Sequence, residues 1–329
     1  MNLVKKDSHK LTTFFQEANL FRMPLFVFDK HMVGKNISLK YLWEKDGKKC
    51  LWQVSPNVEY GLGGAFDDAV LMAIWKIISD MKKPVENPIN IGSLRNIARI
   101  MGYKKPSGKE FLKIKTSLYR LASLTLITAY SFFSKEKGRY LEIKEGIFHL
   151  IDKVYLSTED KNREGNIEEN LIWLNHEVLS NINEHYVRPI DLDFYFSLKH
   201  NITRGLFKIL SESTFASTSS DNSVRYKYST ICSRLVIRQW KNLSRAKQQL
   251  DPAHRELVAK RFLASFRWDG IKNTKNDWYI QYIPEKGGEI KIITPPKAIE
   301  SDTADKTEKQ LEVKPKAIEA DKTTSLKHQ

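Results

Sequence analysis

Two segments of this 329-residue chain carry lysine and arginine at helical spacing, and the second also carries glutamine. These side chains contact the phosphates and base edges of nucleic acids. Residues 95–139 hold eleven Lys and Arg against two Glu, a net charge of +9, and residues 222–275 hold thirteen against three acidic residues, a net charge of +10. The whole chain has a net charge of +15, and the tail from residue 295 is neutral. This focusing indicates a polyanionic partner. The alternative is that both segments form basic helix faces that contact only solvent and bind no polyanion.

The first segment, KEFLKIKTSLYRLASLTL, separates into two sides when it is read as a helix. Its apolar side consists of Phe111, Ile114, Leu118 and Leu121. Its polar side, with offsets of four, three and four residues, consists of Lys109, Lys113, Thr116 and Arg120. A Lys-Pro-Ser-Gly turn before the helix adds Lys104 and Lys105. We expect these six side chains to contact DNA.

The second segment, QWKNLSRAKQQLDPAHRELVAKRFL, separates in the same way. Its buried stripe is expected to consist of Trp240, Leu243, Ala246, Leu250, Ala253 and Leu257. The side chains expected at DNA are Arg238, Lys241, Asn242, Arg245, Gln248 and Gln249. Arg245 and Gln248 are the candidates for reading bases, because Arg pairs with guanine and Gln with adenine. Pro252 either kinks this helix or follows Asp251 as the start of a new one.

A strand pair follows each segment and carries cations at its tip. The first tip has Lys135, Lys137 and Arg139, and the second has Lys272 and Lys275. These side chains are expected at phosphates or in a minor groove. Charged residues are also common at hairpin tips that bind nothing.

Other chemistries find little support in the sequence. GYKKPSGKE resembles a phosphate-binding loop, but five residues separate its glycines and Glu110 stands where a hydroxyl is required. The eight histidines form no HxH or HExxH motif and there is no CxxC, so no metal or cofactor is expected. Asp191 and Asp193 share one face of an expected strand and could suggest a nuclease, but a structural role fits better without further ligands. Asp67 and Asp68 are expected to cap a helix. We therefore expect no enzyme.

The composition places the chain in the cytoplasm. No apolar run of about 18 residues could span a membrane, and the N-terminus lacks a secretory signal pattern. Cys50 and Cys232 are far apart in sequence and are expected to be buried, reduced thiols.

The elements that must position these residues repeat one order. Residues 1–58 are expected to be a strand-rich extension, with a strand at PLFVF and a hairpin turning at Asp46-Gly47. Residues 59–198 then read as three helices and a hairpin, and residues 199–292 repeat that order. A strand at 190–196 is expected to end the first domain, and a helix at 202 to begin the second. The fold class is therefore α+β, with two tandem winged helix-turn-helix domains, mostly helical with small antiparallel wings, and a disordered tail at 293–329.

Several blocks of sequence resemble the replication initiator protein A family of bacterial plasmids. They are EYGLGGAFDDAVLMAI, IDLDFYFSL followed by RGLFKIL, and QLDPAHRELVAKRFL, with NLFRMPLFVF and GIFHLID in support. The likeness covers roughly residues 15–285. It implies a plasmid initiator that binds repeated sites in double-stranded origin DNA, helps to open the duplex and recruits host factors such as a helicase. A more distant likeness to initiators with tandem winged helices implies exchange between monomer and homodimer.

Three functions remain open at this stage. A replication initiator is favoured, and a transcriptional regulator, such as an autorepressor, would use the same modules. A nuclease or primase is the third hypothesis, although no group of residues demands it.

Overall fold

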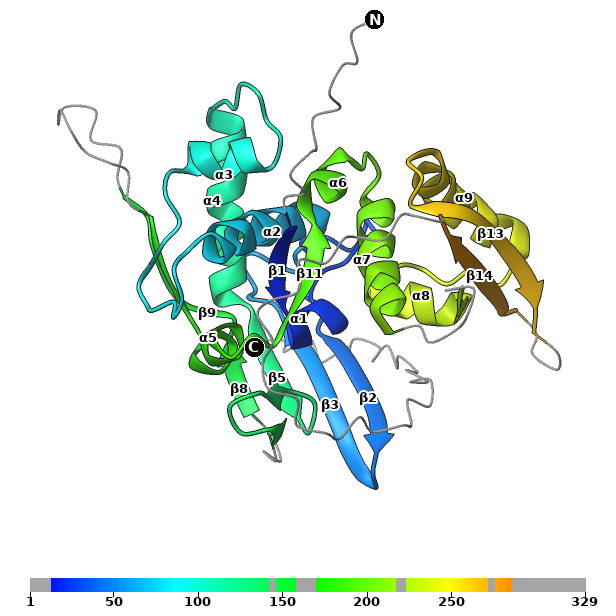
Figure 1. The fold of residues 1–329 in the computed structure, drawn as a ribbon, viewed down its shortest axis with the longest axis horizontal. Coiled ribbons are helices and arrows are strands. Elements are labelled where there is room, and N and C mark those ends of the chain that lie inside the picture. Colours follow the sequence, from blue (N-terminus) through cyan, green and yellow to red (C-terminus); the bar gives the residue numbers. More distant parts are fainter. Residues whose placement is uncertain (1–12, 142–145, 158–169, 217–222, 272–275, 286–329) are drawn as a thin grey trace, which may run out of the picture.

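The computed structural model describes residues 13–141, 146–157, 170–216, 223–271 and 276–285. It is a mixed α/β structure built from helices and small antiparallel sheets (Figure 1). The expected tail at 293–329 and the side chains of Lys272 and Lys275 lie outside the described residues.

The N-terminal part is tied into the body of the protein. It consists of β1 (Thr13–Glu17), α1 (Ala18–Arg22), β2 (Leu39–Lys45) and β3 (Lys48–Ser55). The predicted hairpin is confirmed, since Asp46 and Gly47 adopt positive φ between β2 and β3. The strand predicted at PLFVF is wrong. That stretch forms only an isolated parallel bridge from Val27 to Gly64, and the amides of Val27 and Phe28 donate to the carbonyls of Gly63 and of Leu235, the last residue of a helix.

The first unit, as we call it, contains three helices and a three-stranded sheet. Its elements in chain order are α2 (Ala65–Ser79), β4 (Ile89–Asn90), α3 (Leu94–Ile100), α4 (Gly108–Ser123), β9 (Ile151–Tyr155) and β10 (Leu171–Leu174). The sheet order is β4-β10-β9, with antiparallel neighbours. Nearly every side of α2 is buried, from Ala69 to Ile74 in particular, so it is the central helix.

A second sheet interrupts the first unit between α4 and β9. The inserted strands are β5 (Thr125–Ala129) and β8 (Gly146–His149), which belong to this sheet, and β6 (Phe133–Ser134) and β7 (Arg139–Tyr140), which pair with each other. The four-stranded order β2-β3-β5-β8 joins the N-terminal hairpin to this insertion. The residues before position 58 thus pack with the first unit, while the predicted domain boundaries stay a prediction.

A short helix replaces most of the strand predicted at 190–196. After α5 (His176–Asn183), β11 (Val187–Asp191) pairs with β1, and α6 (Leu192–Ser197) follows at once. The carboxylate of Asp191 accepts a hydrogen bond from the Phe194 amide at 2.9 Å and caps α6. Asp191 and Asp193 therefore do not share a strand face, and Asp191 has a structural role.

The second unit, as we call it, repeats the order of the first. Its elements are α7 (Asn201–Ala216), β12 (Val224–Lys227), α8 (Tyr228–Leu235), α9 (Leu243–Ala259), β13 (Leu263–Gly270) and β14 (Trp278–Pro284). The sheet order β12-β14-β13 matches β4-β10-β9 position by position. The helix α9 continues through Pro252, so no new helix begins there. Asp251 instead accepts a hydrogen bond from the Trp268 indole at 3.0 Å.

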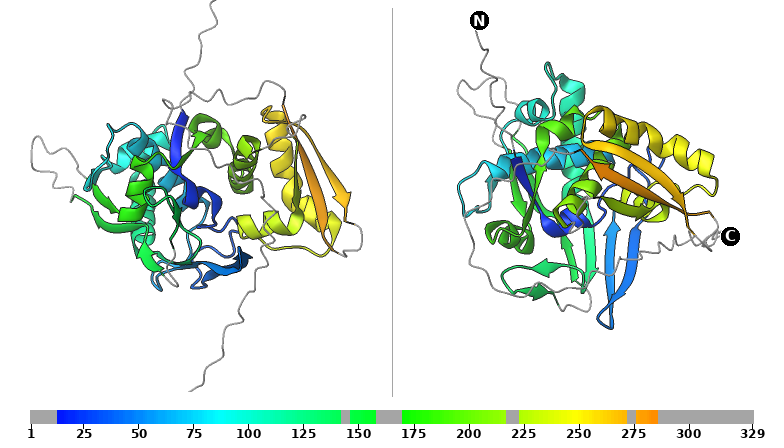
Figure 2. Two further views of the ribbon diagram at one scale, coloured as in Figure 1. Left: turned by 60° about the horizontal axis from the view of Figure 1, so that its bottom comes forward. Right: turned by 45° about the vertical axis from the view of Figure 1, so that its right-hand side comes forward.

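One cluster of buried apolar side chains runs through both units, from Phe14 to Tyr282. The helices α6 and α7 lie between α4 and α9 in both figures (Figure 1, Figure 2). Cys50 and Cys232 are buried free thiols, as predicted, and burial raises the pKa of Cys232 to about 12.

Candidate nucleic-acid interface

The start of α4 is fixed by a capping box. The Ser107 amide donates to the Glu110 carboxylate at 2.9 Å, and the Ser107 hydroxyl donates to the same oxygen. These bonds from Ser107 lower the pKa of Glu110. The Glu110 carboxylate in the GYKKPSGKE stretch thus caps a helix. A phosphate-binding loop needs a Ser or Thr hydroxyl at that position to bind Mg²⁺.

The predicted cationic side of α4 is partly confirmed as an exposed surface. Its inner side is buried through Ile114, Leu118 and Leu121, whereas Lys109 and Lys113 are exposed. Lys104 and Lys105 are exposed in the turn between α3 and α4. The Thr116 hydroxyl donates to the Leu112 carbonyl at 2.9 Å, which leaves it less suited to contact DNA.

Arg120 has partners inside the protein. Its Nη1 lies 2.6 Å from a carboxylate oxygen of Asp67, and its Nε donates to the Tyr60 carbonyl at 2.9 Å. The side chain is 18% exposed. Asp67 also accepts from the Gly64 amide at 2.7 Å, which confirms its predicted capping role. Arg120 therefore fastens α4 to the start of α2, and we leave it out of the proposed DNA surface.

The second predicted set lies at the start of α9, where exposed polar side chains gather. Asn242 caps the helix by accepting from the amides of Ser244 and Arg245 at 2.9 and 3.4 Å. Lys241, Arg245 and Gln248 are exposed. Because the Asn242 side-chain oxygen is occupied by the cap, its amide nitrogen is the group left to face a ligand.

Trp240 also belongs to this set, although its spacing predicts a position in the buried stripe. It is only half-buried, and the guanidinium carbons of Arg238 and Arg245 lie 4.0 and 5.1 Å from its ring centroid. Trp240, Arg245, Gln248 and Gln249 line a shallow hollow. In the sequence, the position of Trp240 between Arg238 and Arg245 at a helix start is the signal that could have identified Trp240 as part of this surface.

The side chain of Gln249 is fixed by a hydrogen bond from Tyr228 at the start of α8. Its side-chain oxygen accepts from the Tyr228 hydroxyl at 2.9 Å, and that hydroxyl accepts from the Trp240 amide at 3.1 Å. The chain of bonds fixes Trp240 and Gln249 relative to α8, so the start of α9 is ordered before any ligand arrives.

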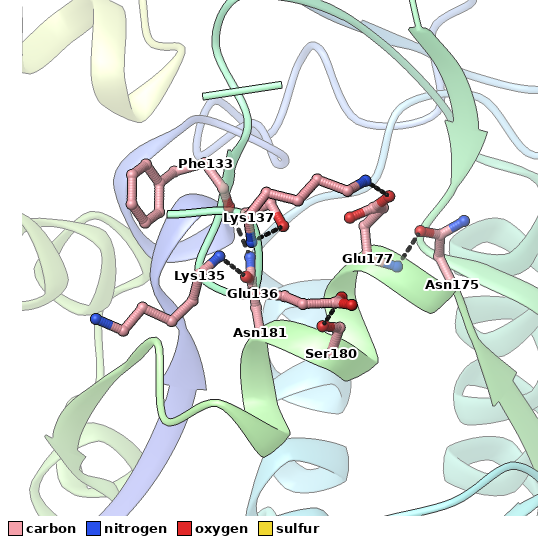
Figure 3. Close-up of polar contacts among 9 residues, drawn as sticks. Phe133, Lys135, Glu136, Lys137, Asn175, Glu177, Ser180 and Asn181 are labelled. Atoms are coloured by element: carbon pink, nitrogen blue, oxygen red, sulfur yellow. Dashed lines mark hydrogen bonds and ion pairs between the residues drawn. The ribbon is translucent and has the colours of Figure 1, made fainter. Parts of the chain in front are cut away.

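The predicted first hairpin tip packs against α5 (Figure 3). The Lys135 amide donates to Asn181 at 2.8 Å, the Ser180 hydroxyl donates to Glu136 at 2.9 Å, and Lys137 Nζ lies 3.1 Å from a Glu177 oxygen. The Lys135 side chain and Arg139 are exposed. The tip belongs to the inserted β6–β7 pair, which is a separate sheet from β4-β10-β9. Its contact with DNA stays a prediction.

A buried ion pair joins the two units. Asp68 of α2, predicted to cap, instead accepts from Lys208 Nζ of α7 and from the Tyr195 hydroxyl of α6, each at 2.7 Å. A second ion-pair network links Glu212 of α7 to Arg22 at 3.2 Å and to Arg234. The Asp68–Lys208 pair holds α7 against α2, and the Glu212–Arg22 pair holds α7 against α1.

Neither a metal site nor a membrane span is found in the part of the chain that the structure describes. Its residues contain no group of three or more His, Cys, Asp or Glu placed to hold a metal ion. None of the helices described is both long and apolar enough to cross a membrane.

Comparisons with known proteins agree with this architecture. A family model described as Replication initiator protein A matches residues 16–251, well over half of the chain. A crystal structure of RctB domains 2–3 is similar at a TM-score of 0.51 and 14% identity, covering 83% of this chain and 99% of that chain. A selenomethionine derivative of RctB domains 2 and 3 gives 0.51 and 12%, covering 82% and 97%. At such identities the likeness shows the fold alone. No curated protein matches the sequence.

Proposed function

Because this chain belongs to the replication initiator protein A family, we propose that it starts replication by binding double-stranded origin DNA through α4 and α9. Opening of the duplex and recruitment of host replication factors such as a helicase follow from that binding. Exchange between monomer and homodimer is a further part of the proposal, and no enzymatic step is assigned to the chain itself.

One observation carries this proposal. Each unit runs helix, strand, helix, helix, strand, strand, and the first strand pairs with the last in both sheets, in the orders β4-β10-β9 and β12-β14-β13. We infer that both units are winged helix-turn-helix domains, in which the third helix enters the major groove. The third helices are α4 and α9, and both present exposed cations beside a buried apolar face.

The charge of these surfaces fits a polyanion. Lys104, Lys105, Lys109 and Lys113 surround the start of α4, and Arg238, Lys241 and Arg245 surround the start of α9. Each Lys or Arg that neutralises a phosphate releases a counterion, so the affinity should fall steeply with salt. Contacts to phosphates fix the position of the protein on DNA, and Arg245 and Gln248 are the side chains placed to read base edges.

The test compares three double variants of equal charge change. We expect Lys241→Ala with Arg245→Ala to abolish specific footprints on origin DNA, and Lys109→Ala with Lys113→Ala to remove protection from an adjoining part of the site. The slope of log affinity against log salt should fall by about 0.9 for each phosphate that a variant no longer neutralises. Lys30→Ala with Lys49→Ala is the matched control, because both lysines are exposed and lie on a loop and on β3.

Unchanged footprints in the α9 variant would contradict the role given to that helix. Unchanged footprints in the α4 variant would leave the first unit as a scaffold. A second assay separates an initiator from a regulator, because the winged-helix modules are the same in both. We expect the chain to support autonomous replication of a circular DNA that carries its origin. Binding without replication would identify a transcriptional regulator.

A further inference from the structure

An apolar side chain lies in the middle of the cationic side of α4. Leu112 is 65% exposed, and among the large apolar side chains that are exposed in the described residues it is the one that lies on an α-helix. It stands three residues after Lys109, one before Lys113 and four before Thr116, so these side chains share a face. The stripe expected from sequence therefore contains a leucine as well as lysines.

Packing within the protein does not account for this leucine. The buried side of α4 is complete through Ile114, Leu118 and Leu121, which are at most 1% exposed. Phe111 is half-buried on the flank, with Arg95 5.8 Å from its ring centroid. Single exposed leucines are common on protein surfaces, so exposure alone does not indicate a function for Leu112. Its position on the side of α4 that is proposed to face the groove does.

The surroundings favour DNA over a protein as the partner of Leu112. Lysine is depleted from the cores of protein–protein interfaces, yet Leu112 is flanked along the helix by Lys109 and Lys113. In the major groove the 5-methyl group of thymine is the apolar feature on the base edges, and apolar side chains contact it. Lysines on either side would meanwhile reach the phosphates that border the groove.

We propose that Leu112 packs against a thymine methyl group and gives the α4 half of the site a preference for thymine at that position. The inference rests on the proposed function, since it requires α4 to enter the major groove. It adds a specificity-determining residue to a helix whose lysines supply affinity without sequence information.

Replacement of thymine by deoxyuridine tests the contact, because it removes only the methyl group. Duplexes enriched from a random pool by the full chain serve as the probe, and each thymine is replaced in turn. We expect one thymine, within the region that loses protection in the Lys109→Ala and Lys113→Ala variant, at which the wild-type affinity falls about fourfold. That factor corresponds to about 0.8 kcal/mol for a buried methyl group at about 1.4 kcal/mol per tenfold.

The variant Leu112→Ala should bind the thymine and deoxyuridine duplexes equally well and should unfold at the wild-type temperature. Leu42→Ala is the matched control, because Leu42 is an exposed leucine on β2, and it should keep the fourfold difference. Equal sensitivity of wild type and Leu112→Ala, or no sensitive thymine in that region, overturns the inference while the proposed function stands. Failure to enrich any duplex overturns both.

Discussion

Lys208→Met should destabilise the protein by about 3 kcal/mol, because it leaves a buried carboxylate without its cation. Asp68 is 0% exposed and Lys208 is 12% exposed, and Nζ lies 2.7 Å from the Asp68 oxygen. Removal of one partner of a buried pair costs about 3–5 kcal/mol. We take the lower end because the Tyr195 hydroxyl still donates to the other Asp68 oxygen at 2.7 Å.

Methionine is chosen because it keeps the unbranched apolar part of the lysine. The variant therefore removes the charge, and with it a contact in which Nζ lies 6.0 Å from the Phe21 ring centroid, with little change in side-chain volume. The removal of a cation–π contact at that distance adds about 0.5–1 kcal/mol at most. Asp68→Asn combined with Lys208→Met should recover much of the stability, since a neutral amide can still accept from Tyr195.

The measurement is the free energy of unfolding in urea for wild type, both single variants and the double variant. Lys76→Met is the matched control. Lys76 pairs with Asp80 within one helix, and Asp80 is 63% exposed, so this variant should change stability by no more than about 0.5 kcal/mol. If Lys208→Met were as stable as Lys76→Met, the claim that this pair fastens α7 to α2 would be refuted.

Two further perturbations test other parts of the structure. Burial raises the pKa of Glu17 to about 7, above about 4.3 in an unfolded chain, so protonated Glu17 stabilises the fold at low pH and this stabilisation is lost as the pH rises through about 7. Relative to Glu17→Gln, wild type should therefore lose about 3 kcal/mol of unfolding free energy between pH 5 and pH 8, and parallel pH profiles would contradict this. Gly205→Ala should cost about 1–3 kcal/mol, because the new Cβ would lie 2.5 Å from a Leu235 methyl group and 3.0 Å from Phe28; an unchanged melting temperature would show that the α7–α8 contact can relax.

Helices with one apolar face could be predicted from sequence, and single contacts between distant residues could not. The helices around Ile114 and Ala246 are confirmed because burial on one side imposes a period that the sequence displays. Arg120 also has the right period for the outer face of α4, but its partners Asp67 and Tyr60 are more than 50 residues away in sequence. No local pattern identifies such partners.

The stretch around Asp191 shows a different limit. Alternation of apolar and acidic residues fits a half-buried strand, and it fits equally well a strand that ends at a helix cap. The choice depends on the bond from the Phe194 amide to the Asp191 carboxylate and on the pairing of β11 with β1. The second of these involves residues 13–17, near the N-terminus. Tertiary structure therefore decides a question that the local pattern leaves open.

The inserted strands β5 to β8 separate α4 from β9 and β10, so the strand pair expected directly after α4 is not part of the β4-β10-β9 sheet. In the second unit the two strands that follow α9 join the sheet of β12, through the pairing of β14 with β12, but after α4 the chain first joins the N-terminal hairpin in another sheet. The sheet of β4 is completed later in the chain, where β10 pairs with β4 and β9 pairs with β10. Lys135 and Lys137 therefore lie on the insertion, packed against α5, and the cations that we assign to DNA in the first unit are those around the start of α4. This shift makes Lys109 and Lys113 the decisive residues for testing whether the first unit binds DNA at all.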